Sequence, residues 1–168
     1  MTNATFYVID TSALIKMNYR YPIPLFKSLW GECNGLIDEG RLGAPATVHE
    51  EIKKKDDDLR KWVKKCQDDL FYDELPFIEY QQDILSKFPG LVDPRRQYDQ
   101  ADPFVIAMAL ERIAKPTLVY QDVCIVTEEE TQIPDQRRVR VRISEVCNHY
   151  GICCIRVLDM IKKEMWVF

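Results

Sequence analysis

The feature that most constrains the fold is a short apolar run near the amino terminus, Phe6-Tyr7-Val8-Ile9, which ends abruptly at Asp10. The run is rich in aromatic and β-branched residues, a composition that predicts a strand buried on both faces. A helical pattern begins directly afterwards. Because open α/β sheets bind ligands at the carboxyl ends of their strands, Asp10 lies where a ligand site is expected. The alternative is that Asp10 or Ser12 only caps the following helix.

Strand-like and helix-like segments alternate along the rest of the chain. Further strands are predicted at residues 41–45, 123–126 and 152–157. Helices are predicted at residues 12–20, 25–40, 45–52, 59–70, 77–88, 103–113 and 143–150, with a closing helix to Trp166. This alternation predicts one α/β domain, residues 1–168, with a parallel sheet covered on both faces. Residues 53–100 contain two of these helices and are expected to form a helical insertion packed on the main domain.

Composition narrows the class of protein. A chain of 168 residues with 46% hydrophobic and 30% charged residues is typical of one globular domain. No leader-like segment precedes Phe6, and the longest apolar run, residues 104–110, is too short to span a bilayer, so a cytoplasmic protein without membrane contact is expected. The net charge of −4 argues against a generally basic nucleic-acid binder, although a metal-binding carboxylate site could account for several negative charges.

The cysteines predict no zinc site. The six cysteines form no CxxC pair, and several lie inside apolar runs. We expect them to be reduced thiols buried in the core. The cysteines are Cys33, Cys66, Cys124, Cys147, Cys153 and Cys154.

Acidic residues from distant parts of the chain are expected to meet at one edge of the sheet. Asp10 follows one strand, and Glu128 or Glu129 follows another. Asp102 is expected at the amino-terminal cap of a buried helix, with Pro103 as its first residue, and Glu50 or Glu51 lies early in a helix that follows a strand. All these positions face the carboxyl edge of a parallel sheet.

Carboxylates held this close repel one another unless a cation joins them. An oxygen-only ligand set favours Mg²⁺ or Mn²⁺, and such a site suits phosphodiester hydrolysis. Each acid also has a simpler interpretation on its own. Asp102 could be only a helix cap, Glu51 a solvated surface residue, and Glu129 one of three exposed glutamates.

Four segments, VIDTSAL, VHEEI, ADPFVIAMAL and IVTEEE, together resemble the ordered motif set of PIN domains. The similarity is greatest to VapC-like toxin ribonucleases, as a divergent branch with a helical insertion. The resemblance implies a three-layer α/β/α sandwich with a small parallel sheet. It also implies an acidic site that binds Mg²⁺ or Mn²⁺ and cleaves RNA, in a toxin controlled by an antitoxin encoded by an adjacent gene. A homodimer is left open.

The resemblance assigns a role to each matching position. The expected catalytic acids are Asp10, Glu51, Asp102 and Glu129, with Asp10, Glu51 and Asp102 as metal ligands and Glu129 as a further candidate ligand. Supporting hydroxyls are expected from Ser12 and Thr127. Glu129 departs from the family, which usually has aspartate there, so Glu128 remains an alternative. His49 and His149 are expected to take no part.

An alternating basic segment follows the last acid. Arg138, Arg140 and Arg142 would lie on one face of an extended segment, where they could contact RNA phosphates or an acidic partner. The alternative is a charged edge that discourages aggregation.

The sequence offers two alternative functions. One is a catalytically weak PIN-like module that binds RNA or protein. The other is a phosphatase of the haloacid dehalogenase type, which the sequence disfavours because Ser12 stands where that family needs a second aspartate.

Overall fold

Five parallel strands form the centre of the fold, in the order β3-β2-β1-β4-β5. The computed structural model describes residues 3–54, 57–129 and 140–168. The strands are β1 (Thr5–Ile9), β2 (Leu42–Pro45), β3 (Phe71–Tyr72), β4 (Asp122–Val126) and β5 (Cys153–Ile155). β1 lies in the middle, and its five residues are all buried. The predicted α/β architecture with a parallel sheet is therefore confirmed.

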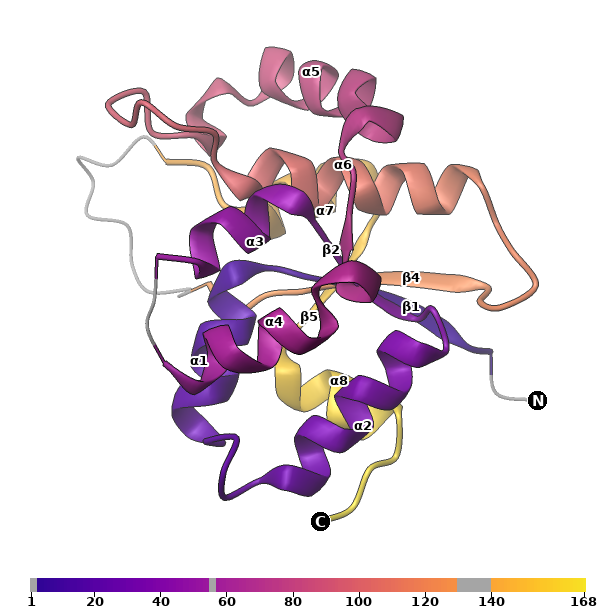
Figure 1. The fold of residues 1–168 in the computed structure, drawn as a ribbon. Coiled ribbons are helices and arrows are strands. Elements are labelled where there is room, and N and C mark those ends of the chain that lie inside the picture. The colour runs from indigo at the N-terminus through magenta and orange to yellow at the C-terminus, as the bar shows by residue number, and fades with distance from the viewer. Residues whose placement is uncertain (1–2, 55–56, 130–139) are drawn as a thin grey trace.

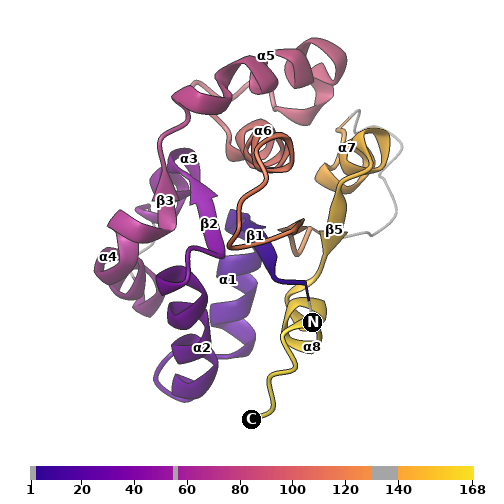
Figure 2. The same ribbon diagram turned by 90° about the vertical axis from the view of Figure 1, so that its right-hand side faces the viewer.

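Helices cover both faces of the sheet and give three layers (Figures 1 and 2). One face carries α6 (Ala101–Ala114), flanked by α5 (Ile78–Lys87) and α7 (Ile143–Tyr150). The other face carries α1 (Thr11–Arg20), α2 (Lys27–Asp38), α4 (Asp58–Leu70) and α8 (Val157–Lys163). α3 (Ala46–Ile52) follows β2 directly, and the short 3₁₀ turns Leu75–Phe77 and Pro89–Leu91 flank α5.

The carboxyl edge of the sheet is defined by the register of β1 and β4. Phe6 pairs with Val123 and Ile9 with Val126, so both strands end at the same level. The backbone N–H of Asp10 donates to the carbonyl of Val126, 3.1 Å away, and continues this pairing past the strand end. The residues that follow the two strands are thereby brought side by side.

The segment predicted as a helical insertion also contains a strand. β3 is only two residues long, too short to give a periodic pattern, and it pairs with Ala44 and Pro45 of β2 at the edge of the sheet. The Tyr72 side chain of β3 packs over Gly43 of β2. A Cβ added to Gly43 would lie 2.6 Å from Cε2 of Tyr72, so a glycine is favoured at this position. The insertion therefore belongs to the sheet.

Other differences from the predictions are local. The cap of α6 is Gln100, so Asp102 lies in the first turn and is not the cap. Leu25 precedes α2 and is 79% exposed, although it continues the helical pattern of the sequence. Cys153 is exposed and Cys66 and Cys154 are only partly buried, contrary to the expected buried thiols, whereas Cys33, Cys124 and Cys147 are buried. α7 ends at Gly151, which adopts φ 69°, as the sequence predicts.

Within the described residues, no helix combines the length and apolar character needed to cross a membrane.

Candidate acidic site

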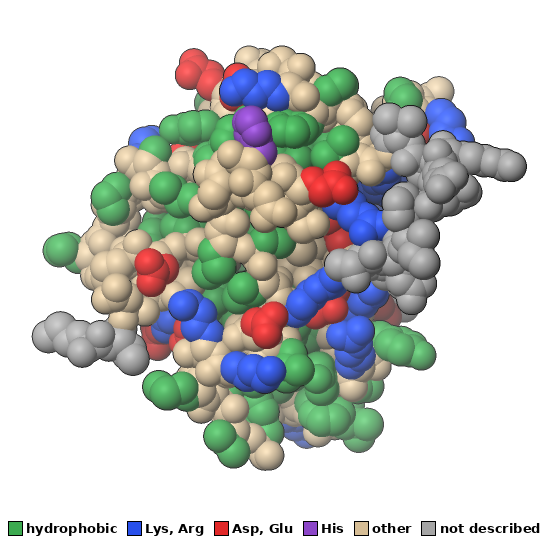
Figure 3. All heavy atoms as spheres, turned by 180° about the vertical axis from the view of Figure 1, so that it is seen from behind, with side chains coloured by type: hydrophobic (Ala, Val, Ile, Leu, Met, Phe, Trp, Pro, Cys, Tyr) green, Lys and Arg blue, Asp and Glu red, His purple; other side chains and the backbone are tan. Residues whose placement is uncertain are grey.

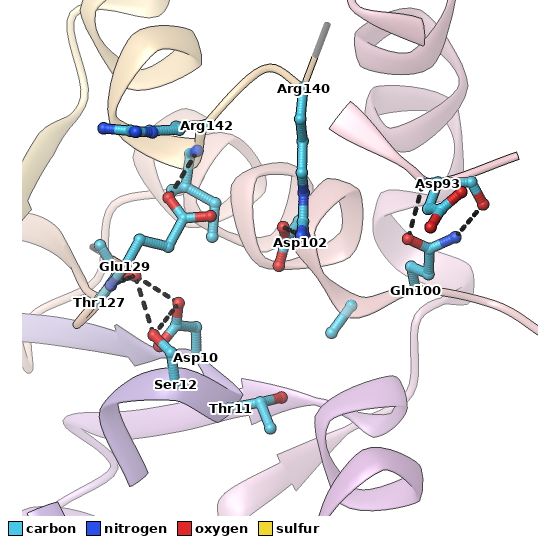
Figure 4. Close-up of polar contacts among 12 residues, drawn as sticks. Asp10, Thr11, Ser12, Asp93, Gln100, Asp102, Thr127, Glu129, Arg140 and Arg142 are labelled. Carbon is cyan, nitrogen blue, oxygen red and sulfur yellow. Dashed lines mark hydrogen bonds and ion pairs between the residues drawn. The ribbon is translucent and has the colours of Figure 1, made fainter. Parts of the chain in front are cut away.

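Asp10 occupies the carboxyl end of β1 and is 2% exposed. Its carboxylate caps α1 by accepting the N–H of Ala13 at 2.7 Å, and it accepts the hydroxyl of Thr127 at 2.5 Å. Ser12 donates to the same carboxylate at 2.8 Å. The capping role and the position at the sheet edge are therefore both present. Ser12 and Thr127, the two predicted supporting hydroxyls, lie directly on Asp10 (Figure 4).

Burial raises the pKa of Asp10 to about 6, although hydrogen bonds from Thr127, Ala13 and Ser12 favour its ionised form. The neighbouring carboxylate of Glu129 raises the pKa further. The surroundings of Asp10 therefore stabilise the negative charge of its carboxylate only in part.

Glu50 and Glu51 point in different directions from α3. Glu50 is exposed and forms an ion pair with Lys53 at 2.9 Å. Glu51 accepts a hydrogen bond from the hydroxyl of Thr11 and another, at 3.1 Å, from the backbone N–H of Ala101. Glu51 therefore joins the amino-terminal ends of α1 and α6, and it is the member of the pair that faces the site.

Asp102 lies in the first turn of α6 and faces Arg140, whose guanidinium is 3.5 Å from Oδ2 (Figure 4). Burial raises the pKa of Asp102 to about 7, and the negative charges of Asp10 and Glu51 add to the rise. Arg140 acts in the opposite direction but does not cancel it. Asp102 is thus electrostatically coupled to two other acids of the predicted set.

Glu129 faces this group from the loop after β4. Its Oε2 accepts the backbone N–H of Ile143 at 2.9 Å, which ties the loop to the start of α7. Burial raises its pKa to about 7, and the charge of Asp102 raises it further. Glu129 therefore completes a cluster with Asp10 and Asp102.

Glu128 is directed elsewhere and is 4% exposed. It forms ion pairs with Arg20 at 3.2 Å and Arg156 at 3.6 Å, and its Oε1 accepts the N–H of Val157 at 3.0 Å. These contacts join α1, β4 and the start of α8. The alternative in which Glu128 completes the acidic cluster does not match this geometry.

The predicted basic residues lie in part around the cluster. Arg140 pairs with Asp102, and Figure 4 shows Arg142 above Glu129. Arg138 lies outside the described residues. On the face drawn in Figure 3, basic and acidic side chains are interspersed and do not form separate patches. Of the two arginines described, Arg140 is therefore paired with an acid of the same site.

Neither histidine lies in the cluster. His49 stacks on Phe71, with ring centroids 4.5 Å apart, and His149 packs edge-on against Phe88. Burial and the charge of Lys53 lower the pKa of His49. Both rings pack against aromatic side chains.

The donor set matches a hard divalent cation in chemistry, since carboxylate and hydroxyl oxygens surround the cluster. In the side-chain arrangement of residues 3–54, 57–129 and 140–168, no three His, Cys, Asp or Glu side chains lie close enough to ligate one ion. Mg²⁺ commonly needs only one or two protein carboxylates, with waters and substrate phosphate as its other ligands. Asp10, Asp102 and Glu129 are the residues that could supply them.

The sequence did not predict two sets of contacts around these glutamates. Thr11 holds Glu51, and the ion pairs of Arg20 and Arg156 hold Glu128. The spacing of Lys16 and Arg20, four residues apart on α1, was the available signal for the second. Both side chains reach the Glu128 region, and Lys16 donates to the carbonyl of Glu128 at 2.9 Å.

The fold and the site together define an α/β protein with a parallel sheet and buried carboxylates gathered at its carboxyl edge. The chain belongs to the family described as "Domain of unknown function (DUF4411)", whose model matches residues 7–168. Comparison with curated proteins and with solved structures gave no significant match.

Proposed function

We propose that this chain is a metal-dependent endoribonuclease that hydrolyses RNA phosphodiesters at the acidic cluster. The observation that carries the proposal is the gathering of Asp10, Asp102 and Glu129, which come from three distant parts of the chain. Each of their pKa values is raised towards neutrality by burial, and by the charge of another member. Perturbed carboxylates in one polar site are typical of catalytic centres.

The proposed cofactor is Mg²⁺ or Mn²⁺, held by Asp10 and Asp102 with Glu51 or Glu129 in support. A bound cation would offset the crowded negative charge, hold a phosphate oxygen and lower the pKa of the attacking water. The all-oxygen donor set supports these ions over zinc.

The chain's own residues divide the remaining work. Ser12 and Thr127 fix the orientation of Asp10 through their hydroxyls. Glu129 has a pKa of about 7 and keeps Oε1 without a hydrogen bond among the described residues, so it suits the role of proton acceptor for the attacking water. Arg140 and Arg142 lie where they could contact phosphate groups of the RNA.

The PIN-like motif order supports a more specific role, that of a VapC-like toxin of a type II toxin–antitoxin pair acting in the cytoplasm. An RNase active without control would harm its own cell, so an antitoxin that covers the acidic cluster is part of the proposal. An arginine or lysine from the antitoxin would suit the cluster's charge.

One observation favours a second candidate, a catalytically weak module that binds RNA or protein. Both oxygens of Asp10 and both oxygens of Glu51 already accept hydrogen bonds within the chain, and Asp102 is paired with Arg140. A site kept in this arrangement would bind without hydrolysing.

Cleavage assays separate the two. Purified protein should cut single-stranded or structured RNA with Mg²⁺ or Mn²⁺ and stop when EDTA is added. Asp102→Asn should reduce the rate by about 10²-fold or more, as expected for loss of a catalytic carboxylate. Glu50→Gln, which alters an exposed residue on the same edge, is the matched control. RNA binding without cleavage under any metal would favour the second candidate.

A further inference from the structure

A cavity of about 230 Å³ opens beside the acidic cluster, between the end of β4 and the starts of α7 and α8. Its lining residues are Thr127, Glu129, Arg142, Ser144, Cys154, Ile155, Arg156 and Asp159. Thr127 and Glu129 belong to both the cavity and the acidic cluster, so the two are continuous. The volume is many times the roughly 10–15 Å³ that one water requires, so a larger group can enter.

The polar groups of the lining favour an anion. Arg142 and Arg156 contribute two guanidinium groups from different elements, and Ser144 contributes a hydroxyl that has no protein partner among the described residues. Each of the two carboxylates of the lining has one oxygen engaged in a backbone hydrogen bond. Asp159 accepts the N–H of Arg156 at 3.2 Å, and Glu129 accepts the N–H of Ile143 at 2.9 Å. Guanidinium groups are the side chains best suited to bind phosphate oxygens.

Arg156 is held in position by its ion pair with Glu128, 3.6 Å away. Glu128 is buried and is held in turn by the N–H of Val157 and by Arg20. Arg156 is only partly exposed. It lines the cavity and also forms the ion pair with the Glu128 carboxylate. An arginine held this way loses little conformational freedom when it binds an anion.

We propose that this cavity is a phosphate-binding subsite for the RNA phosphate next to the one that is cleaved. The proposal rests on the nuclease function proposed above and deepens it, because it fixes the side of the acidic cluster on which the RNA backbone continues. The backbone passes from the cluster over Thr127 and Glu129 towards α7 and α8. Arg156 and Ser144 thereby become substrate-binding residues.

The chain offers a matched pair of variants for the test. Arg156→Gln and Arg20→Gln each remove one ion pair to Glu128, but only Arg156 lines the cavity. Thermal melts of both variants should show similar small losses, because both lose a contact to the same carboxylate. Any difference between them in anion binding then reports on the cavity.

The first measurement is a titration of metal-free protein in EDTA with inorganic phosphate, followed by calorimetry or NMR. Wild type and Arg20→Gln should bind alike, and Arg156→Gln should bind about 10-fold more weakly or worse, the loss expected for one charge-assisted hydrogen bond. Equal phosphate affinity in the two variants would overturn the subsite. This readout needs no cleavage and no metal.

The second measurement is RNA hydrolysis with Mn²⁺. Arg156→Gln should raise KM about 10-fold with little change in kcat, whereas Arg20→Gln should change neither. RNA carrying a methylphosphonate beside the cleaved bond should lose the difference between wild type and Arg156→Gln. If Arg156→Gln binds inorganic phosphate more weakly but its KM for RNA is unchanged, the cavity binds a free anion. That result would overturn its assignment to RNA. If no RNA is cleaved, the nuclease function fails, and the phosphate titration alone still decides whether the cavity binds an anion.

Discussion

Glu128 and Glu129 are consecutive residues at the end of β4, yet Glu128 pairs with Arg20 and Arg156 while Glu129 joins the acidic cluster. The two side chains leave the loop after β4 in different directions, as their separate partners show. Glu128 therefore connects α8 to the end of β4, and Glu129 adds negative charge to the candidate site. The pair gives a direct test of which acid is functional.

We expect Glu129→Gln to lower RNA cleavage by about 10²-fold while leaving the melting temperature unchanged or higher, because a buried carboxylate that favours its neutral form is replaced by a neutral group. Glu128→Gln should do the reverse. It breaks two ion pairs to a buried carboxylate, so it should lower the melting temperature and spare most of the activity per folded molecule. Cleavage rates and thermal melts on both variants are the measurements. The opposite ranking would assign the site to Glu128.

Glu50 and Glu51 form a second adjacent pair with different surroundings. Glu51→Gln keeps an acceptor for the N–H of Ala101 but removes the charge near Asp102, so cleavage should fall by about 10-fold or more. Glu50→Gln loses only an exposed ion pair with Lys53 and should stay within a factor of two of wild type. A large loss of cleavage in Glu50→Gln, together with an unchanged cleavage rate in Glu51→Gln, would contradict the geometry of α3.

Asp10 both caps α1 and contributes to the cluster, and two substitutions separate these roles. Asp10→Asn can still accept the N–H of Ala13, so its metal-free form should melt no lower than wild type at pH 8. Asp10→Ala loses the cap, worth about 1 kcal/mol, and should melt about 2–4 °C below Asp10→Asn.

Both Asp10 variants should gain less stability from Mn²⁺ than wild type, which gains about 2.7 kcal/mol at a hundred times its dissociation constant. Melts with and without Mn²⁺ provide the measurement. An equal metal response in all three proteins would exclude Asp10 from the metal site.

The pKa values predict how metal-free stability depends on pH. Asp10 at about 6 and Asp102 at about 7 both lie above the usual 3.8, and Glu129 at about 7 lies above 4.5. Between about pH 4 and pH 7 the folded state therefore binds more protons than the unfolded chain. Stability is fully present below that range and is lost as the pH rises through about 7.

Melts in EDTA at pH 4.5, 6 and 7.5 should show this fall, and Asp102→Asn should flatten it. Added Mn²⁺ should stabilise the protein most at the upper end of the range, because protons compete with the metal for the same carboxylates. Stability in EDTA that rises from pH 4.5 to 7.5 would contradict the crowded cluster.

Local sequence patterns were enough for most of the fold. The β1 run and the acid that ends it gave both the central strand and Asp10, because burial on two faces leaves a continuous apolar run. β3 was missed because two residues carry no periodicity, and its place depends on β2. The exposure of Leu25 was missed because a helical pattern does not show where the helix starts.

The site was less predictable for a different reason. The choice of Glu51 over Glu50 followed from a family resemblance. The hydrogen bonds that orient Glu51, from Thr11 and from the N–H of Ala101, depend on tertiary structure. In a run of three glutamates the local chemistry is the same at each position. Only the ion pair with Arg156, which comes from a distant part of the chain, shows that Glu128 has a structural role. The contact between Arg140 and Asp102, 38 residues apart, has no local signal either.

Arg140 supplies the last prediction, because its guanidinium is the positive charge nearest to Asp102 among the contacts described, at 3.5 Å. Its charge holds the pKa of Asp102 below the value that burial and the neighbouring acids would otherwise impose. In Arg140→Gln the metal-free protein should therefore lose stability more steeply as the pH rises towards 8. The matched control is Lys53→Gln, which removes one exposed cation paired with Glu50.

Mn²⁺ should stabilise Arg140→Gln more than wild type, since no guanidinium then competes with the cation for Asp102. RNA binding should weaken in the same variant if Arg140 contacts phosphate once the cation is present. Melts with and without Mn²⁺, and RNA binding in the Asp102→Asn background where cleavage is suppressed, give the two readouts. A metal response equal to that of wild type and of Lys53→Gln would show that Arg140 and the cation do not share Asp102, and would place the metal elsewhere in the cluster.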